Sequence, residues 1–221
     1  MKILVQGFGP FSRFAVNPSE LLVRALRDRQ PARGDLRAEV LETTAANVAE
    51  AVPALMEDVR PDVWIGVGLA AGRPALSVEA VAVNIGCWQT GDPEADPQAG
   101  GEPWPRHPVA AGGAAAYLTT LPAGEILGAW RDAEIPGYLS NTAGTYLCNM
   151  SFYLAAQAAE RLGTGCLVGF VHVPLLPAQV TKPASEPSMS FALQQAGLDV
   201  VLDTCRASGR TGGPVSTGRT G

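Results

Sequence analysis

Short apolar segments alternate with helix-favouring segments along nearly the whole chain of 221 residues. This alternation is typical of a domain in which helices cover a mostly parallel sheet, because a parallel connection needs a crossover that is usually a helix. No internal repeat and no linker divides the sequence, and its length is sufficient for one sizeable core. We therefore expect a single α/β domain with a mixed, mostly parallel twisted sheet.

The expected elements follow from apolar runs and from helix start signals. Strands are expected at Ile3–Gln6, Leu36–Leu41, Asp62–Gly68, Ala75–Ile85, Gly137–Ser140 and Gly165–Val173. Helices are expected at Ser19–Arg29, Ala45–Val59, Pro122–Ala133, Tyr146–Leu162 and Pro187–Arg206. Asn17 is expected to cap the first helix, which Pro18 opens. The Pro- and Gly-rich stretch from Gly86 to Gly113 is expected to be a long functional or interface loop, and Ser208 to Gly221 a disordered tail.

Charge and composition disfavour two classes of partner. The net charge is −5, and no stripe of Lys and Arg is present to neutralise nucleic-acid phosphates. No apolar run approaches the roughly 18 residues that cross a bilayer. The N-terminal run from Met1 to Gly7 has too few charges and too short an apolar stretch for a signal peptide. We expect a cytoplasmic protein that binds neither nucleic acid nor a membrane.

The four cysteines are Cys87, Cys148, Cys166 and Cys205, and none lies in a C-x-x-C pair. Neither a disulfide framework nor a structural zinc site is expected from this spacing. Cys166 lies in an apolar run and is expected to be a small core residue. Cys205 is expected at the surface or on a helix face, and Cys87, which lies in a loop, can be either a core or a surface residue.

Cys148 follows a polar, Gly-containing turn that begins at Ser140 and leads directly into the expected helix Tyr146–Leu162. A thiol in the first turn of a helix lies close to unpaired backbone N–H groups and to the positive end of the helix dipole. This setting is expected to lower the pKa of the thiol and to supply the thiolate that attacks carbonyls. The alternative is that Cys148 is a small buried hydrophobic residue.

Two further residues could complete a catalytic group with that thiol. His172 ends an apolar strand, and the chain has only two histidines; His107, the other one, is expected to be a solvated loop residue. Glu79 lies in the expected strand Ala75–Ile85, on the face that carries Val81 and other apolar residues, so its carboxylate needs a partner. That partner could be the His172 ring, whose tautomer the carboxylate would fix.

Each of these two assignments has an alternative. Glu79 taken alone is better explained as a strand-end carboxylate paired with an arginine such as Arg73, and His172 could be a satisfied core histidine. The three residues taken together, at the ends of three elements in the order Glu, Cys, His, favour a cysteine nucleophile with a histidine base.

Two loops after strands could form the walls of a pocket. The first runs from Gly7 to Phe14 and contains three phenylalanines; it lacks the later glycine of a dinucleotide-binding fingerprint. Its rings could offer flat apolar walls, or at least one of them could fold over the core. The second loop runs from Gly68 to Arg73 and follows a strand end, where ligand sites of α/β proteins gather.

Five motifs in order resemble the pyroglutamyl peptidase I family, also called pyrrolidone carboxyl peptidases. They are G-F-x-P-F at Gly7 with Asn17-Pro18-Ser19; Pro61-Asp62 through Val67-Gly68 to Gly72-Arg73; Glu79-x-x-Ala82-Val83-Asn84; Ser140-x-x-Ala143-Gly144-x-x-x-Cys148-Asn149; and Gly169-Phe170-x-His172-Val173-Pro174 with Pro177. The resemblance covers residues 1–207.

The resemblance implies an α/β/α sandwich and a cysteine peptidase that removes an N-terminal 5-oxoproline from peptides without a metal or cofactor. It implies a triad of Glu79, Cys148 and His172, and usually a homotetramer. Phe8 and Phe11 match positions that line the ring pocket, and Asn17 lies beside them. We also assign three further residues to substrate binding: Phe14, Leu69 and Leu147.

The chain departs from the family pattern in two loops. Ser12 and Arg13, with the additional Phe14, stand where the family usually has two glycines, and Gln89 stands where a loop arginine would fall. Two other functions therefore remain open. The first is a cysteine amidohydrolase for another acyl group on this scaffold, and the second is a non-catalytic binder of pyroglutamyl-capped peptides.

Overall fold

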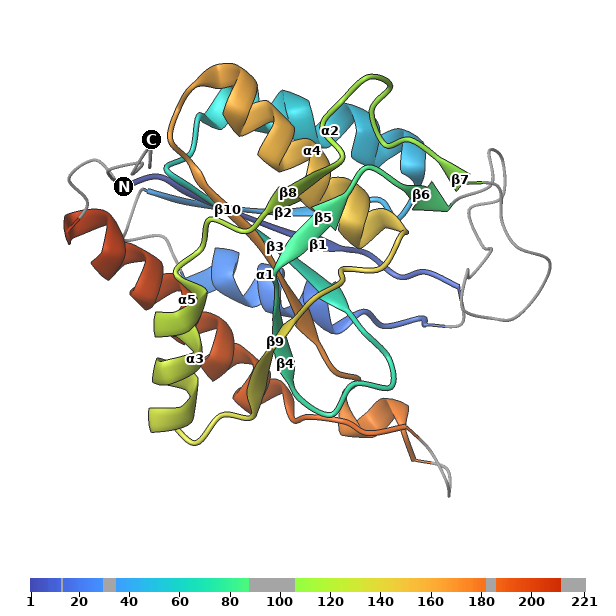
Figure 1. The fold of residues 1–221 in the computed structure, drawn as a ribbon. Coiled ribbons are helices and arrows are strands. Elements are labelled where there is room, and N and C mark those ends of the chain that lie inside the picture. Colours follow the sequence, from blue (N-terminus) through green and yellow to red (C-terminus); the bar gives the residue numbers. More distant parts are fainter. Residues whose placement is uncertain (13, 30–34, 88–105, 182–185, 212–221) are drawn as a thin grey trace.

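A six-stranded sheet forms the centre of the computed structural model, which describes residues 1–12, 14–29, 35–87, 106–181 and 186–211 (Figure 1). The strands lie in the order β2-β1-β3-β10-β4-β9. Their bounds are β1 Ile3–Phe8, β2 Leu36–Leu41, β3 Val63–Leu69, β4 Leu76–Glu79, β9 Gly137–Ser140 and β10 Leu167–Val173. Only the pair β10–β4 is antiparallel within this sheet. The prediction of a mixed, mostly parallel sheet is confirmed.

Helices cover both faces of the sheet (Figure 1). One face carries α1 Pro18–Arg29, α3 Ala123–Asp132 and α5 Phe191–Thr211, and the other carries α2 Ala45–Val59 and α4 Leu147–Leu162. A short 3-10 helix, η1, spans Pro177–Gln179. Each face of the sheet has its own buried apolar cluster, so the chain is an α/β/α sandwich. None of the helices in the described ranges is long and apolar enough to cross a membrane.

The central strands are buried on both faces, as expected for parallel strands between two helical layers. All seven residues of β3 are buried. In β10 the side chains alternate, with Val171 in the cluster under α1 and α5 and Phe170 in the cluster under α4. His172 follows the parity of Phe170 and therefore points to the α4 face, and this places the candidate site between the sheet and α4.

The expected strand Ala75–Ile85 is two strands, which corrects the prediction. β4 ends at Glu79, and β5, Val81–Val83, pairs with β8, Ala116–Leu118, in a separate two-stranded sheet. The break lies at Ala80, whose N–H donates to the Ser140 carbonyl at 2.7 Å. Its own carbonyl accepts from the Thr119 N–H at 2.9 Å. Ala80 thus joins the two sheets, and Val81 is not a continuation of the strand face that carries Glu79.

The start of the expected loop Gly86–Gly113 pairs with a later part of the same loop. β6, Gly86–Cys87, lies antiparallel to β7, Arg106–His107, and His107 is exposed as expected. The Cys87 N–H donates to the Thr145 carbonyl at 2.7 Å, which ties this loop to the segment before Cys148. Gln89 lies outside the described residues.

The last helix differs from the prediction at both ends. It begins at Phe191 rather than Pro187 and continues to Thr211, so four residues expected in the tail are helical. The Ser208 hydroxyl donates to the Thr204 carbonyl one turn earlier at 3.1 Å, which supports the helix there. Residues 212–221 lie outside the described ranges. Cys166 is a core residue as expected, and Cys205 lies on the buried face of α5 rather than at the surface.

Candidate active site

The candidate residues meet because neighbouring strands bring them to one edge and one face of the sheet. Parallel strands β1, β3 and β10 end near one another, at Phe8, Leu69 and His172–Val173. β4 runs antiparallel to β10 and places Ser77 opposite His172 and Glu79 opposite Phe170. Directly opposite residues share a face, so the Glu79 carboxylate and the His172 ring both lie on the α4 side.

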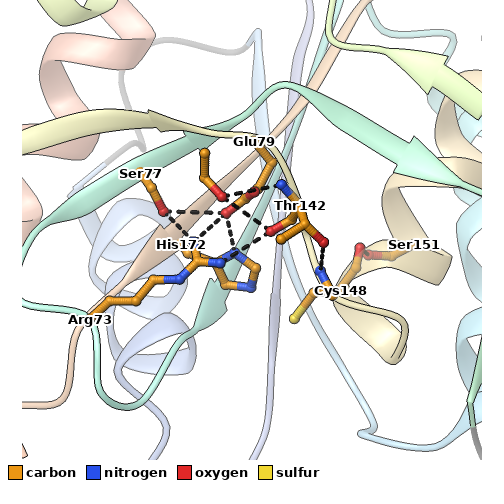
Figure 2. Close-up of polar contacts among 9 residues, drawn as sticks. Arg73, Ser77, Glu79, Thr142, Cys148, Ser151 and His172 are labelled. Carbon is orange, nitrogen blue, oxygen red and sulfur yellow. Dashed lines mark hydrogen bonds and ion pairs between the residues drawn. The ribbon is translucent and has the colours of Figure 1, made fainter.

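Glu79 and His172 form a buried pair. The His172 Nδ1 lies 2.7 Å from Glu79 Oε1. His172 is 4% exposed and Glu79 is 0% exposed. Because an ionised carboxylate only accepts hydrogen bonds, Nδ1 carries the proton and Nε2 holds the lone pair. In Figure 2 the ring lies between Glu79 and the thiol of Cys148. The pair thus has the orientation of a base held by a carboxylate.

Arg73 binds the same carboxylate oxygen. Its Nη1 lies 2.5 Å from Glu79 Oε1 and also donates to the Ser77 hydroxyl at 2.6 Å. The two partners that the sequence presented as alternatives for Glu79 are therefore both present. Ser77 was not among the site residues expected from the sequence. It could have been found there, because it lies two residues before Glu79 and therefore on the same face of the strand.

The charges around Glu79 and His172 define their protonation states at neutral pH. Burial raises the pKa of Glu79, but the hydrogen bond from His172, the charge that this ring carries once it is protonated, and the charge of Arg73 outweigh it and hold that pKa below its ordinary value. Burial lowers the pKa of His172, and Glu79 only partly opposes this effect. The resting site therefore holds a carboxylate beside a neutral imidazole.

Cys148 lies in the first turn of α4, with Tyr146 as the N-cap residue. The next residue, Asn149, is fully buried and fixes this turn: its side chain accepts from the Val83 N–H at 2.8 Å and donates to the Val83 and Ile85 carbonyls at 2.9 Å. The turn that carries the thiol is therefore held by two hydrogen bonds to β5 and one to Ile85, which follows it.

Gly68 makes the space for the sulfur. A Cβ atom at this position would lie 2.8 Å from Cys148 Sγ, which is too close for real atoms. Gly68 is also the parallel partner of His172 in the sheet, so their side-chain positions point to the same face. The thiol of Cys148 thus lies over the sheet position next to the imidazole.

The state of the thiol corrects the expectation from the sequence. Burial and the negative charge of Glu79 raise the pKa of Cys148 to about 12, although Arg73 and the backbone N–H of Cys148 act in the opposite direction. The position at the helix terminus indicated a thiolate. The carboxylate of Glu79, which opposes this effect, lies on β4, and its proximity to the thiol could not be seen in the local sequence. The resting pair is a neutral thiol beside a neutral imidazole.

Cys148 and His172 line a cleft of about 260 Å³. The cleft is also lined by Phe11, Phe14, Leu69–Ala71, Arg73 and Ala143–Tyr146. An adjoining recess of about 20 Å³ is bordered by Phe8, Phe11, Asn17, Thr43, Leu69 and Tyr146–Cys148. All six residues assigned to substrate binding border the cleft or the recess. Glu79 lines neither and lies behind His172. Tyr146 and the segment before it are lining residues that the sequence analysis did not assign.

The three phenylalanines of the N-terminal loop differ in position. Phe11 and Phe14 form a backbone bridge with N–H to carbonyl distances of 3.2 and 2.8 Å, and their ring centroids lie 5.3 Å apart. Phe8 is 3% exposed and packs on Phe170 with ring centroids 6.4 Å apart. Phe8 is thus the ring that belongs to the core, and Phe11 and Phe14 form the aromatic wall of the cleft.

Asn17 caps α1, as expected. Its Oδ1 accepts from the Ser19 N–H at 3.1 Å and from the Ser19 hydroxyl at 2.9 Å, and its Nδ2 donates to the Gly9 carbonyl at 2.9 Å. The side chain therefore holds the N-terminal loop on the helix and borders the recess. Within the described ranges, no group of three His, Cys, Asp or Glu residues is arranged to hold a metal ion.

Known proteins share this fold and match the sequence over most of its length. The family model described as pyroglutamyl peptidase matches residues 1–207. A pyrrolidone-carboxylate peptidase of Ralstonia nicotianae is 37% identical over 202 residues, which is 91% of either chain. The pyrrolidone-carboxylate peptidase of Pyrococcus furiosus is 33% identical over 207 residues, covering 92% of this chain and 97% of the relative.

The solved structures agree with the sequence matches. The crystal structure of pyrrolidone carboxyl peptidase from the hyperthermophile Pyrococcus furiosus superposes with a TM-score of 0.83 at 32% identity. The match covers 94% of this chain and 99% of that one. Sequence and architecture thus agree over nearly the full length, and the chain belongs to the pyroglutamyl peptidase family.

Proposed function

We propose that the chain removes an N-terminal pyroglutamyl residue from peptides, with Cys148 as the nucleophile. The observation that carries the proposal is the arrangement of Cys148 and His172 in one cleft with an aromatic wall, in a chain of a cysteine peptidase family. Glu79 supports this role because it orients the imidazole from a fully buried position. The reaction class is acyl transfer to sulfur followed by hydrolysis.

The first step forms the acyl-enzyme. His172 Nε2 takes the proton from the Cys148 thiol as the sulfur attacks the carbonyl between pyroglutamate and the next residue. The tetrahedral intermediate then collapses, and the imidazolium gives that proton to the leaving amine. Because burial and the charge of Glu79 raise the pKa of the resting thiol, we assign the proton transfer to His172 to the same step as the attack.

The second step releases pyroglutamate. His172 removes a proton from water as the water oxygen attacks the thioester carbonyl, and the proton returns to the sulfur as the C–S bond breaks. The Glu79 carboxylate stabilises the imidazolium in both steps without accepting its proton. Backbone N–H groups in the first turn of α4 stabilise the oxyanion.

Recognition needs a flat apolar contact and paired polar groups. The lactam ring can pack against the aromatic wall formed by Phe11 and Phe14, which line the cleft with the thiol. The lactam carbonyl distinguishes pyroglutamate from proline, and a site built to bind that carbonyl rejects the analogue that lacks it.

The test is release of a fluorescent amine from pyroglutamyl and prolyl amides by the wild-type chain and the Cys148→Ser variant. The wild type should release it from the pyroglutamyl amide alone, and the variant should be inactive because a serine hydroxyl is far less acidic than a thiol. Cys166→Ser is the matched control and should retain most of the activity, because this thiol lies in the core.

Other outcomes support the remaining functions. Turnover of a different acyl amide alone would indicate another cysteine amidohydrolase, and tight binding of a pyroglutamyl peptide without release would indicate a binder. We further propose a cytoplasmic homo-oligomer, which the composition and the exposed apolar residues of the edge strands support.

A further inference from the structure

Arg73 joins three separate parts of the site. Its Nη1 donates to Glu79 and to Ser77 on β4, and its Nη2 donates to the Thr142 carbonyl at 3.1 Å. Thr142 belongs to the segment between β9 and α4 that leads to Cys148. Figure 2 shows the guanidinium beside His172, with bonds to the triad carboxylate and to this segment. One side chain thus connects the acid of the triad with the backbone before the nucleophile.

Glu79 needs a cation. The residue is fully buried, and its Oε2 accepts no hydrogen bond from a described residue. The titratable groups that face it are His172 from β10, Arg73 from the β3–β4 loop and Cys148 from α4. Since the imidazole and the thiol are both neutral at rest, Arg73 is the one charge among them that offsets the buried carboxylate.

We propose that Arg73 is a positioning residue of the reaction, which keeps Glu79 ionised and holds the segment before Cys148 at the correct distance from His172. This inference rests on the proposed function. Arginine suits the task because its planar fork reaches the Glu79 carboxylate and the Thr142 carbonyl from different nitrogens, whereas a lysine supplies one point charge. From the sequence, Arg73 was expected in a loop that could border the pocket and as an alternative to His172 as the partner of Glu79.

The proposal has a signature in the pH dependence. The charge of Arg73 lowers the pKa values of Glu79, His172 and Cys148. Removing that charge therefore raises all three pKa values. The acid limb of kcat/KM should move to higher pH, because His172 stays protonated longer, and alkylation of Cys148 should require higher pH as well.

The experiment compares Arg73→Met and Arg73→Lys with the wild type. For Arg73→Met, kcat/KM for a pyroglutamyl amide should fall about tenfold or more, mainly in kcat. Its acid limb should rise by roughly half a pH unit or more. Arg73→Lys should return the limb toward its wild-type position and restore only part of kcat, because the bond to Thr142 is lost.

The matched control is Arg161→Met, which removes an arginine that pairs with Glu57 near the C-terminal end of α4, the opposite end from Cys148. It should leave the pH profile unchanged. The proposal is overturned if Arg73→Met keeps the wild-type profile with kcat/KM within about twofold. If Arg73→Met does not fold, full kcat in Arg73→Lys overturns the role of the planar guanidinium.

Alkylation separates failure of this inference from failure of the proposed function. The rate of Cys148 modification by iodoacetamide, located by mass spectrometry, is measured against pH in the same variants without any substrate. A shift of this profile to higher pH in Arg73→Met supports the inference even if the wild type does not cleave pyroglutamyl amides. An unshifted alkylation profile contradicts it even if the wild type is an active peptidase.

Discussion

At the residue scale, Glu79 acts on both reacting groups. Its carboxylate raises the pKa of His172 through a hydrogen bond and a charge, and it also raises the pKa of Cys148 through its charge. The same group that makes the imidazole a stronger base thus makes the thiol a weaker acid. Glu79 thus raises the pKa values of both groups, and both pKa values should fall when its charge is removed. The pH dependence of kcat/KM and of Cys148 alkylation reports these two changes in the same variant.

Glu79→Gln should lower kcat by roughly 100-fold or more, because the amide cannot stabilise the imidazolium that forms in each step. The remaining activity should have its acid limb at lower pH, since the pKa of His172 falls when the carboxylate is lost. Alkylation of Cys148 should also begin at lower pH. The measurements are kcat/KM and alkylation rate between about pH 4 and pH 10.

This direction is opposite to the one expected for Arg73→Met, so the two variants serve as controls for each other. If both variants shift the profile the same way, or Glu79→Gln keeps the wild-type rate, Glu79 is only a structural partner of Arg73. A double variant should return the limb toward the wild-type position while the rate stays low.

At the scale of an element, the loop after β1 combines a core residue with an aromatic wall. Phe11→Ala and Phe14→Ala should each lower kcat/KM for pyroglutamyl amides by an amount equivalent to about 1–3 kcal/mol, with little change in Tm. Phe8→Ala should instead cost about 3–5 kcal/mol of unfolding free energy, because its ring is buried against Phe170. Thermal unfolding and steady-state kinetics distinguish the two effects.

Iodoacetamide reactivity of Cys148 is the control, since loss of a pocket wall should leave it nearly unchanged. Equal losses of Tm and kcat/KM in all three variants would show that the rings are one packing cluster. The aromatic wall would then have no separate role in substrate binding.

The elements that were predicted well carry strong local signals. Leu36–Leu41, Ala45–Val59 and Gly137–Ser140 were predicted with the bounds that the structure has, because each has a continuous pattern between polar or Gly-rich ends. The break at Ala80 was not predictable, since the apolar run has no Gly or Pro there. Its cause is a pair of long-range backbone bonds, to Ser140 and Thr119.

The candidate site was predictable in its members and less so in its interactions. The residue types and their order indicated Glu79, Cys148 and His172, and the structure brings them together. The shared binding of Glu79 by His172 and Arg73 depends on the register between β4 and β10, which no local pattern encodes. The pKa of Cys148 depends on Glu79, which lies on β4 and far from Cys148 in the sequence.

At the scale of the whole molecule, some of the exposed apolar residues lie on strands at the edges of sheets. Leu118 on β8 is 73% exposed, and Tyr138 and Leu139 on β9 are 38% and 44% exposed. Edge strands with exposed apolar side chains are suited to contact another chain. Light scattering should therefore give a mass that is a multiple of 22.9 kDa, and Leu118→Asp or Leu139→Asp should lower it. A monomer mass for the wild type would contradict the proposed assembly.

Gly68 has a consequence for how other chains of this fold should be interpreted. A chain could keep the glutamate, the cysteine and the histidine and still be unable to react, if any side chain occupied this position and displaced the sulfur. In Gly68→Ala the new methyl group would collide with Cys148 Sγ and with the Phe170 ring, at 2.8 and 2.9 Å. Turnover and alkylation of Cys148 should therefore both fall while every triad residue remains, and wild-type values for both would show that the sulfur can move aside. The three triad residues are thus insufficient to identify a peptidase of this kind. A glycine at the β3 position that pairs with His172 is a fourth requirement.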